Sequence, residues 1–397
     1  MNTLIQEKCQ QAIRVLKKTG VDAWLTLVRE TSCNRDPVLP LIFGDGDLTW
    51  LSAFLFTRSG ERIAILGRYE AEIARRTGAY DQVLFYDESI QPLLIETLSR
   101  IDPQQLAVNT SLHDIHADGL SHGLYRLLLQ YLEATPYHDR LIESSPVVSA
   151  LRGRKSREEI RRIRAAVAET ADIFDKTIAW MQVGMTEIQV SEFMHAEMAA
   201  RGLDAAWTYE SCPAVNTGPE SPVGHSGPTD LVIEPGHIVH FDFGVKKEGY
   251  CSDMQRVVYF LRPGETAAPA EVQRGFDTVR DAVKNAVNIM RPGIAAYEVD
   301  EAARSTVTGA GYPSYQYSTG HQLGRLAHDG GASLSARWER YGDLPYRLIE
   351  SNQVYTVEPG LPVPGYGYMG LEEDVLVTAA GAGFLWPPQT RLILKQS

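Results

Sequence analysis

Two aspartates, Asp242 and Asp253, lie in consecutive strand-like runs of the segment HFDFGVKKEGYCSDMQ, residues 240–255. If residues 238–246 and 250–260 form a hairpin whose loop is centred between residues 247 and 248, the two side chains lie directly opposite each other on one face of the sheet. Facing carboxylates repel each other, and burial makes an ionised carboxylate still more costly. A divalent cation would remove this conflict, because hard metal ions bind carboxylate oxygens. The alternative, a turn or edge position for each acid, is disfavoured because both lie within strand patterns.

Three segments further along the chain could complete a metal site. In STGHQLGRLAHDGG, His321 follows a glycine and His328 comes seven residues later, and in NQVYTVEPG, Glu358 ends a strand-like run. In GYMGLEEDVLVT, Glu372, Glu373 and Asp374 lead into a strand-like run, with Glu372 and Asp374 on one face. Each residue alone has a simpler interpretation, as a hydrogen-bonding loop histidine, a strand-end charge or part of a solvated face. Taken together, carboxylates and an imidazole in this order would form a hard, oxygen-rich site that favours Mn²⁺ and tolerates Zn²⁺ or Co²⁺. Such a set can hold two ions about 3.5 to 4 Å apart.

The elements that would carry these residues belong to the second half of the chain. Helical and strand-like patterns there cover residues 156–182, 187–201 and 268–290 (helical) and residues 238–246, 250–260, 353–358 and 371–378 (strand-like). Residues 311–331 and 361–370 have the composition of loops. The first part of the chain instead alternates helix patterns with buried strands, which we expect in DAWLTLVRE, GERIAILGR and QQLAVN. We therefore expect an α/β domain over residues 1–148 and an α+β domain over residues 149–397.

Composition argues against several classes of function. The chain of 397 residues is 44% hydrophobic and 22% charged, which is typical of a soluble globular protein with two domains. A formal net charge of -12 and the lack of a basic stripe argue against nucleic-acid binding. No apolar run approaches about 18 residues and the N-terminal segment lacks a signal-peptide core, so we expect no membrane contact and a cytoplasmic location. The four cysteines include no CxxC pair, which argues against a zinc knuckle or a disulfide framework.

The order and spacing of the acids and the histidine resemble those of the pita-bread metallopeptidases, which include methionine aminopeptidase, prolidase and aminopeptidase P. The resemblance covers residues 150–397, and the two-domain layout is similar to that of the prolidase and aminopeptidase P branch. The family pattern is an aspartate, a second aspartate eleven residues later, a Gly-His pair, a strand ending in Glu-Pro and a glutamate six residues before a strand-end threonine. The matching positions, which the resemblance implies as metal ligands, are Asp242, Asp253, His321, Glu358 and Glu372. Counting back from Thr378 favours Glu372 over Glu373.

The resemblance implies a pita-bread catalytic domain preceded by a smaller α/β N-terminal domain. It also implies hydrolysis of Xaa-Pro bonds, which we expect of an Xaa-Pro dipeptidase (prolidase) using a hydroxide activated by two divalent metal ions. Glu358 is expected to assist proton transfer, while His225 and His328 match family histidines that contact the substrate. Tyr317 is one of several aromatic residues available to contact a proline ring. Members of this branch are often homodimers, and we expect a homodimer here.

Two alternatives to the dipeptidase remain open. Within the peptidases, the alternative is an aminopeptidase P acting on longer Xaa-Pro peptides. From another class, the alternative is a pita-bread lyase or amidinohydrolase acting on a small non-peptide substrate.

The sequence departs from the family pattern at three points that concern the substrate. GHQLG stands where relatives have GHGIG, His328-Asp329 stands where they have His-Glu, and Gly370 stands where prolidases and aminopeptidase P usually have arginine. A dipeptidase must recognise the free carboxylate of its substrate, usually with arginine. Of the arginines between the Gly-His loop and Glu358, Arg347 is our preferred candidate for that contact, with a solvated loop charge as the alternative.

Overall fold

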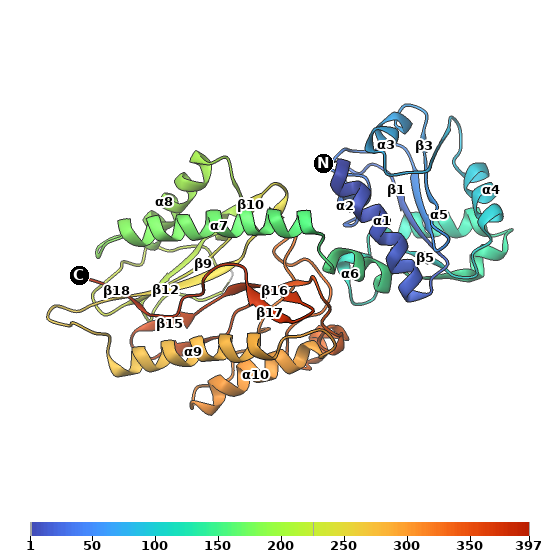
Figure 1. Ribbon diagram of the computed structural model, residues 1–397. Helices are drawn as coiled ribbons and strands as arrows, with labels where there is room; N and C mark the ends of the chain where they lie inside the picture. Colours follow the sequence, from blue (N-terminus) through green and yellow to red (C-terminus); the bar gives the residue numbers. More distant parts are fainter. Residues whose placement is uncertain (1, 225, 397) are drawn as a thin grey trace. The chain divides into compact units, whose positions relative to one another are not determined.

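The computed structural model describes residues 2–224 and 226–396 (Figure 1). The chain forms two compact units, Met1–Arg152 and Gly153–Ser397. The predicted domain boundary between residues 148 and 149 lies within helix α6 (Ser145–Gly153) and stays a prediction. Within the described residues, no helix is both long and apolar enough to span a bilayer.

The first unit is built on a mixed six-stranded sheet with the strand order β4-β3-β2-β1-β5-β6. Its strands are β1 Ala23–Val28, β2 Ser52–Thr57, β3 Arg62–Gly67, β4 Gln82–Tyr86, β5 Leu106–Val108 and β6 Leu141–Glu143. Its helices before α6 are α1 Asn2–Thr19, α2 Leu39–Ile42, α3 Ala71–Thr77, α4 Gln91–Ile101 and α5 His122–Leu132. Because successive strand residues point to opposite faces, Trp24 and Phe54 pack with α1 whereas Leu25 and Leu55 pack with α4 and α5. The predicted α/β architecture is confirmed.

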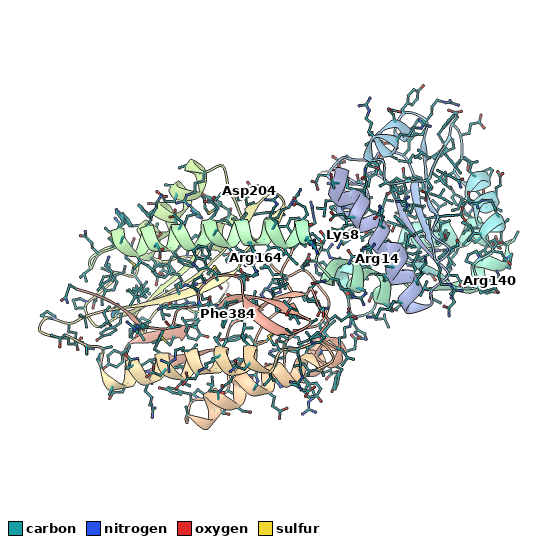
Figure 2. All side chains as sticks on the ribbon, in the orientation of Figure 1. Lys8, Arg14, Arg140, Arg164, Asp204 and Phe384 are labelled. Atoms are coloured by element: carbon teal, nitrogen blue, oxygen red, sulfur yellow. The ribbon has the colours of Figure 1, made fainter. Side chains whose placement is uncertain are left out.

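The second unit combines helices with several small sheets, as expected for the α+β class. Its helices are α7 Arg157–Trp180, α8 Glu187–Ala200, α9 Ala270–Ile289 and α10 Ala296–Gly309. Its strands are β7 Asp204–Ala205, β8 Ala214–Thr217, β9 Ile238–Phe243, β10 Val245–Lys247, β11 Tyr250–Cys251, β12 Met254–Phe260, β13 Val354–Val357, β14 Gly360–Val363, β15 Gly367–Gly370, β16 Glu373–Thr378, β17 Gly381–Phe384 and β18 Ile393–Lys395. They form sheets in the orders β18-β12-β9-β8, β13-β16-β17, β11-β10-β7 and β14-β15. In Figure 1, α7 and α9 lie on opposite sides of these strands, and Figure 2 shows side chains filling the layers between them.

Local sequence explains where the long helices begin and how they pack. Helix α7 starts at a capping box, in which the Ser156 side chain accepts a hydrogen bond from the Glu159 amide and the Glu159 side chain accepts one from the Ser156 amide. Helix α9 buries Phe276 and Val279 in a core shared with strand β14. The predicted helices over residues 156–182, 187–201 and 268–290 are confirmed by α7, α8 and α9.

Strand β9 has one apolar face and one polar face. Phe174 of helix α7 packs edge-on against Phe241 and Phe243, with ring centroids 6.0 and 5.7 Å apart. Both phenylalanines are fully buried. Side chains alternate along a strand, so Asp242 points to the face away from α7.

The predicted register of the hairpin is wrong by two residues. Its turn consists of Glu248 and Gly249 alone, both with positive φ (50° and 77°), because a tight turn between twisted strands requires that backbone conformation. Asp242 therefore pairs with Gln255, and Asp253 lies just before β12 instead of directly opposite Asp242. A shift of two residues keeps every side chain on its original face. The two aspartates thus remain neighbours on one face, in a diagonal arrangement.

The loop prediction for residues 361–370 is also wrong. This segment forms most of an antiparallel hairpin, β14 paired with β15. Its glycines and prolines suggested a loop, but Leu361 and Val363 are buried in the core with α9, while Pro362 between them is exposed on the free edge of a two-stranded sheet. Residues 311–331, all of them described, form an irregular loop as predicted.

Candidate metal centre

The structure brings the five predicted metal ligands together in one cavity of about 660 Å³. Asp242 lies near the end of β9, Asp253 just before β12, His321 in the long loop, Glu358 just after β13 and Glu372 just before β16. His321 Nε2 lies 3.5 Å from Glu358 Oε1, 3.7 Å from Asp253 Oδ2 and 4.0 Å from Glu372 Oε1. Ligand atoms of Asp253, His321 and Glu372 all lie within 4.8 Å of one another, which is a spacing that one metal ion can bridge.

Backbone hydrogen bonds fix the segments that carry these side chains. The Gln255 amide donates to the Glu372 carbonyl (3.2 Å), which joins the start of β12 to the start of β16. The Glu358 amide donates to the Thr319 carbonyl (2.7 Å), which joins the end of β13 to the loop before His321. These hydrogen bonds fix the backbone of the segments that carry Glu358 and Glu372.

Burial and mutual repulsion disfavour the ionised form of the four carboxylates. Burial raises the pKa of Asp242 to about 7. Burial, with the charge of Asp242 added to it, raises the pKa of Glu358 well above its usual range. The pKa values of Asp253 and Glu372 are raised in the same way, by burial first and by neighbouring carboxylates second.

Two of these oxygens also lack hydrogen bonds. Asp242 Oδ1 and Glu372 Oε1 are buried, and neither has a partner among the residues that the structure describes. An orphaned buried oxygen is costly, and a divalent cation would satisfy both atoms and offset the repulsion around them. The donor set of four carboxylates and one imidazole therefore fits divalent metal ions.

The neighbouring Glu373 has a different environment. Its carboxylate pairs with the buried Arg256 (Nη1 to Oε1, 3.1 Å) and accepts a hydrogen bond from the Gln389 amide (2.8 Å). Glu372 lines the cavity on the opposite side of the chain. The geometry agrees with the choice of Glu372 over Glu373 as the candidate ligand.

The residues predicted to contact the substrate have different locations. His328 lines the cavity and stacks on His321, with ring centroids 3.8 Å apart. His225 lies outside the described residues. Arg347 does not belong to the described lining of the cavity, and its Nε donates to Asp343 Oδ2 (3.2 Å). The structure therefore places His328, but not Arg347, beside the candidate ligands.

Three polar residues that contact one another, His240, Gln255 and Asn216, are among the cavity residues that the sequence analysis missed. His240 lies 2.9 Å (Nε2) from Gln255 Oε1 and 3.2 Å (Nδ1) from Asn216 Oδ1. Burial lowers the pKa of His240 to about 4. His240 precedes Asp242 by two residues and Gln255 follows Asp253 by two, so the strand period of two could have indicated them. Asn216 carries no such signal because it comes from the separate strand β8.

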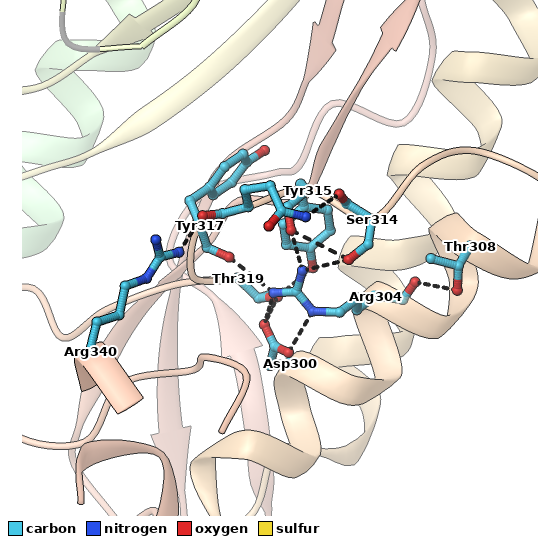
Figure 3. A network of polar contacts seen from close by, with 9 residues as sticks. Asp300, Arg304, Thr308, Ser314, Tyr315, Tyr317, Thr319 and Arg340 are labelled. Atoms are coloured by element: carbon cyan, nitrogen blue, oxygen red, sulfur yellow. Dashed lines mark hydrogen bonds and ion pairs between the residues drawn. The ribbon is translucent and has the colours of Figure 1, made fainter. Parts of the chain in front are cut away.

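Tyr317 also lines the cavity, where its hydroxyl hydrogen-bonds to that of Tyr368. The loop that carries Tyr317 is anchored by Arg304 of helix α10 (Figure 3). Arg304 pairs with Asp300 (2.6 Å) and donates to the Tyr317 carbonyl (3.0 Å), and Thr319 donates to the same Asp300 (2.7 Å). These contacts fix the loop that carries Tyr317 to helix α10.

Comparisons with known proteins agree with this architecture. The model of metallopeptidase family M24 matches residues 161–379. An uncharacterized peptidase of Staphylococcus saprophyticus is 28% identical over 83% of this chain and 86% of its own length. Among solved structures, the Xaa-Pro dipeptidase from Bacillus anthracis has a TM-score of 0.74 at 22% identity, covering 98% of this chain and 100% of that one. The X-Pro aminopeptidase from Thermotoga maritima has a TM-score of 0.71 at 23% identity, covering 98% and 99%. Both solved structures share the fold of this chain.

Proposed function

The chain belongs to metallopeptidase family M24 and is a metallopeptidase, and we propose that it hydrolyses the peptide bond before proline in Xaa-Pro substrates. The observation that carries the proposal is the convergence of Asp242, Asp253, His321, Glu358 and Glu372 in one cavity with unsatisfied carboxylate oxygens. The preference for proline is supported by the fold shared with a solved Xaa-Pro dipeptidase and a solved X-Pro aminopeptidase. The cavity lining also includes the aromatic residues Tyr317, Tyr368 and Trp207, which supports this preference because such side chains pack against an apolar ring.

We propose that the five residues hold two divalent metal ions, with Mn²⁺ preferred because the donor set is rich in hard oxygens. When bound, such ions supply Lewis-acid chemistry and lower the pKa of water. The remaining steps fall to residues of this chain. Glu358 takes up the proton that water releases on attack and gives it to the leaving nitrogen of proline. His328 donates a hydrogen bond to the substrate carbonyl oxygen as negative charge develops there, and His225 is proposed to assist it.

The test is a comparison of substrates on the purified full-length protein after loading with MnCl₂. We expect Ala-Pro-Ala or Ala-Pro to be hydrolysed, Ala-Ala-Ala to be left intact, and activity to disappear after chelation. Equal hydrolysis of Ala-Ala-Ala would refute the proline preference, and full activity after removal of all metal would refute the proposed centre.

A further inference from the structure

The cavity contains an uncharged polar surface beside the candidate metal centre. It consists of Asn216, His240 and Gln255, which we call the neutral patch. These residues come from three adjacent strands, β8, β9 and β12, and Asn216 lies directly opposite His240. All three are at least nine-tenths buried, with exposed fractions of 4%, 3% and 6%. All three line the same cavity as Asp242.

Hydrogen bonds hold the neutral patch in one arrangement. The Asn216 side-chain amide donates to Ser221 Oγ (3.2 Å) and to the Pro222 carbonyl (2.9 Å), which leaves its Oδ1 facing His240 Nδ1. His240 Nε2 in turn lies 2.9 Å from the side-chain oxygen Oε1 of Gln255. The Tyr368 ring stands edge-on to His240, with centroids 5.2 Å apart. The patch is thus a fixed array of neutral donors and acceptors.

The neutral patch occupies the space next to Gly370. A Cβ atom at position 370 would lie 2.5 Å from Gln255 Oε1 and 2.8 Å from His240 Nε2, which is closer than carbon and these atoms can approach. A side chain at position 370 therefore cannot enter the cavity while His240 and Gln255 remain where they are. The glycine and the patch form one packing arrangement, and it leaves no room for the arginine that relatives have at this position.

The described lining of the cavity includes four carboxylates and no lysine or arginine. Arg256 is adjacent in sequence to Gln255 but points to the other face of β12, where Glu373 binds it. Two divalent cations would balance the charge of the four carboxylates. No net positive charge would then remain to pair with a carboxylate of the substrate. A free carboxylate on the substrate would then meet neutral groups and buried acids, whereas an amide would find hydrogen-bond donors and acceptors without electrostatic cost.

We propose that the neutral patch is a specificity-determining subsite that selects an uncharged amide over a free carboxylate on the carboxyl side of the scissile bond. The preferred substrates are then Xaa-Pro peptides that continue beyond the proline or end in an amide. This inference rests on the proposed Xaa-Pro peptidase function, and it favours longer peptides over the dipeptides that the sequence suggested.

The test compares two substrates that differ only at the carboxyl terminus, Ala-Pro and Ala-Pro-amide, with the Mn²⁺-loaded full-length protein. We expect kcat/KM to be at least about tenfold higher for the amide, because a site without a basic group discriminates against an extra negative charge. If both substrates are hydrolysed and kcat/KM for Ala-Pro equals or exceeds that for Ala-Pro-amide, the inference is overturned and the proposed function stays intact. Hydrolysis of neither would remove the proposed function, and the inference with it.

Substitutions at Gln255 test whether the neutral patch causes the preference for an amide over a free carboxylate. Gln255→Lys places an ammonium in the subsite and should lower the amide-to-acid ratio of kcat/KM at least about tenfold. The nearly isosteric Gln255→Glu should raise that ratio, which provides a second test if the lysine variant folds poorly. The matched control is Gln273→Lys, which makes the same charge change on the exposed face of α9 and should leave the ratio unchanged. An unchanged ratio in both folded Gln255 variants would refute the role of the patch.

Discussion

Replacing Asp242 by asparagine should stabilise the metal-free protein and weaken metal binding at the same time. Burial raises the pKa of Asp242 from 3.8 to about 7. At about 1.36 kcal/mol per pKa unit, the ionised side chain therefore costs about 4 kcal/mol in the folded state. Because the folded pKa lies above the unfolded one, the stability contributed by protonated Asp242 is complete below about pH 3.8 and is lost as the pH rises through about 7. Asp242→Asn keeps the shape and removes the charge.

The assay is thermal unfolding of wild type and Asp242→Asn at pH 8 and at pH 5, each with a chelator and with Mn²⁺. With chelator at pH 8, the variant should be more stable by up to about 4 kcal/mol, or about 8 to 16 °C in Tm for a unit of this size. At pH 5 the difference should fall to about 1.6 kcal/mol, because Asp242 is then protonated in the folded state but still ionised in the unfolded chain. With Mn²⁺ the advantage of the variant should shrink, since wild type gains about 2.7 kcal/mol at a metal concentration of 100 Kd and the variant, which has lost a charged ligand, gains less.

The matched control is Glu373→Gln, which also neutralises a buried acid of this region. Burial raises the pKa of Glu373 to about 7 as well, but Glu373 has a cationic partner in Arg256, so its replacement leaves a buried guanidinium without its counter-ion. We expect destabilisation by about 3 to 5 kcal/mol with and without metal, and unchanged metal affinity. The reasoning about Asp242 is refuted if Asp242→Asn lowers the metal-free Tm at pH 8 as Glu373→Gln does, or if it binds Mn²⁺ as tightly as wild type.

Three further predictions follow from the same geometry. Asp253→Ala should abolish both metal binding, measured by elemental analysis, and Xaa-Pro hydrolysis; an active, metal-free variant would contradict the site. Chelation should lower the Tm of wild type more at pH 8 than at pH 5.5, because the raised pKa values let protons replace the metal at lower pH; an equal loss at both pH values would argue against carboxylate ligands. Lys155→Met should destabilise the protein by about 3 to 5 kcal/mol in chemical denaturation, because Lys155 Nζ lies 2.5 Å from buried Asp329 Oδ2; a change below about 1 kcal/mol would show that the pair adds little.

Sequence periodicity was sufficient to find the candidate ligands but not to pair the strands. The predicted turn was centred between residues 247 and 248, but the observed turn consists of Glu248 and Gly249 and is centred one residue later. This difference moved the register by two residues. The error did not affect the choice of residues, because the face of a strand residue depends only on whether the shift is even. Asp242 and Asp253 therefore stayed on one face although they are not direct partners.

Side-chain contacts that do not follow from the two-residue alternation along a strand could not be predicted. Arg347 was preferred as a substrate contact from its place in the sequence, but its side chain is held by Asp343 and lies outside the described cavity lining. Asn216 reaches the cavity only because β8 pairs with β9. Such choices depend on which strands become neighbours, which is a property of the tertiary fold.

The lack of lysine and arginine in the described cavity lining has two consequences for function. A lysine or arginine among the four carboxylates would neutralise them within the chain and compete with any divalent cation for their oxygens. The described lining holds no such residue, so the repulsion between Asp242 and its neighbours can be relieved by an external cation or by protons. For the same reason no lysine or arginine of this lining can pair with a substrate carboxylate, and the patch around His240 closes the space at Gly370 where a basic side chain could enter. The chemistry that makes the site suitable for a metal thus also restricts the substrate that fits beside it.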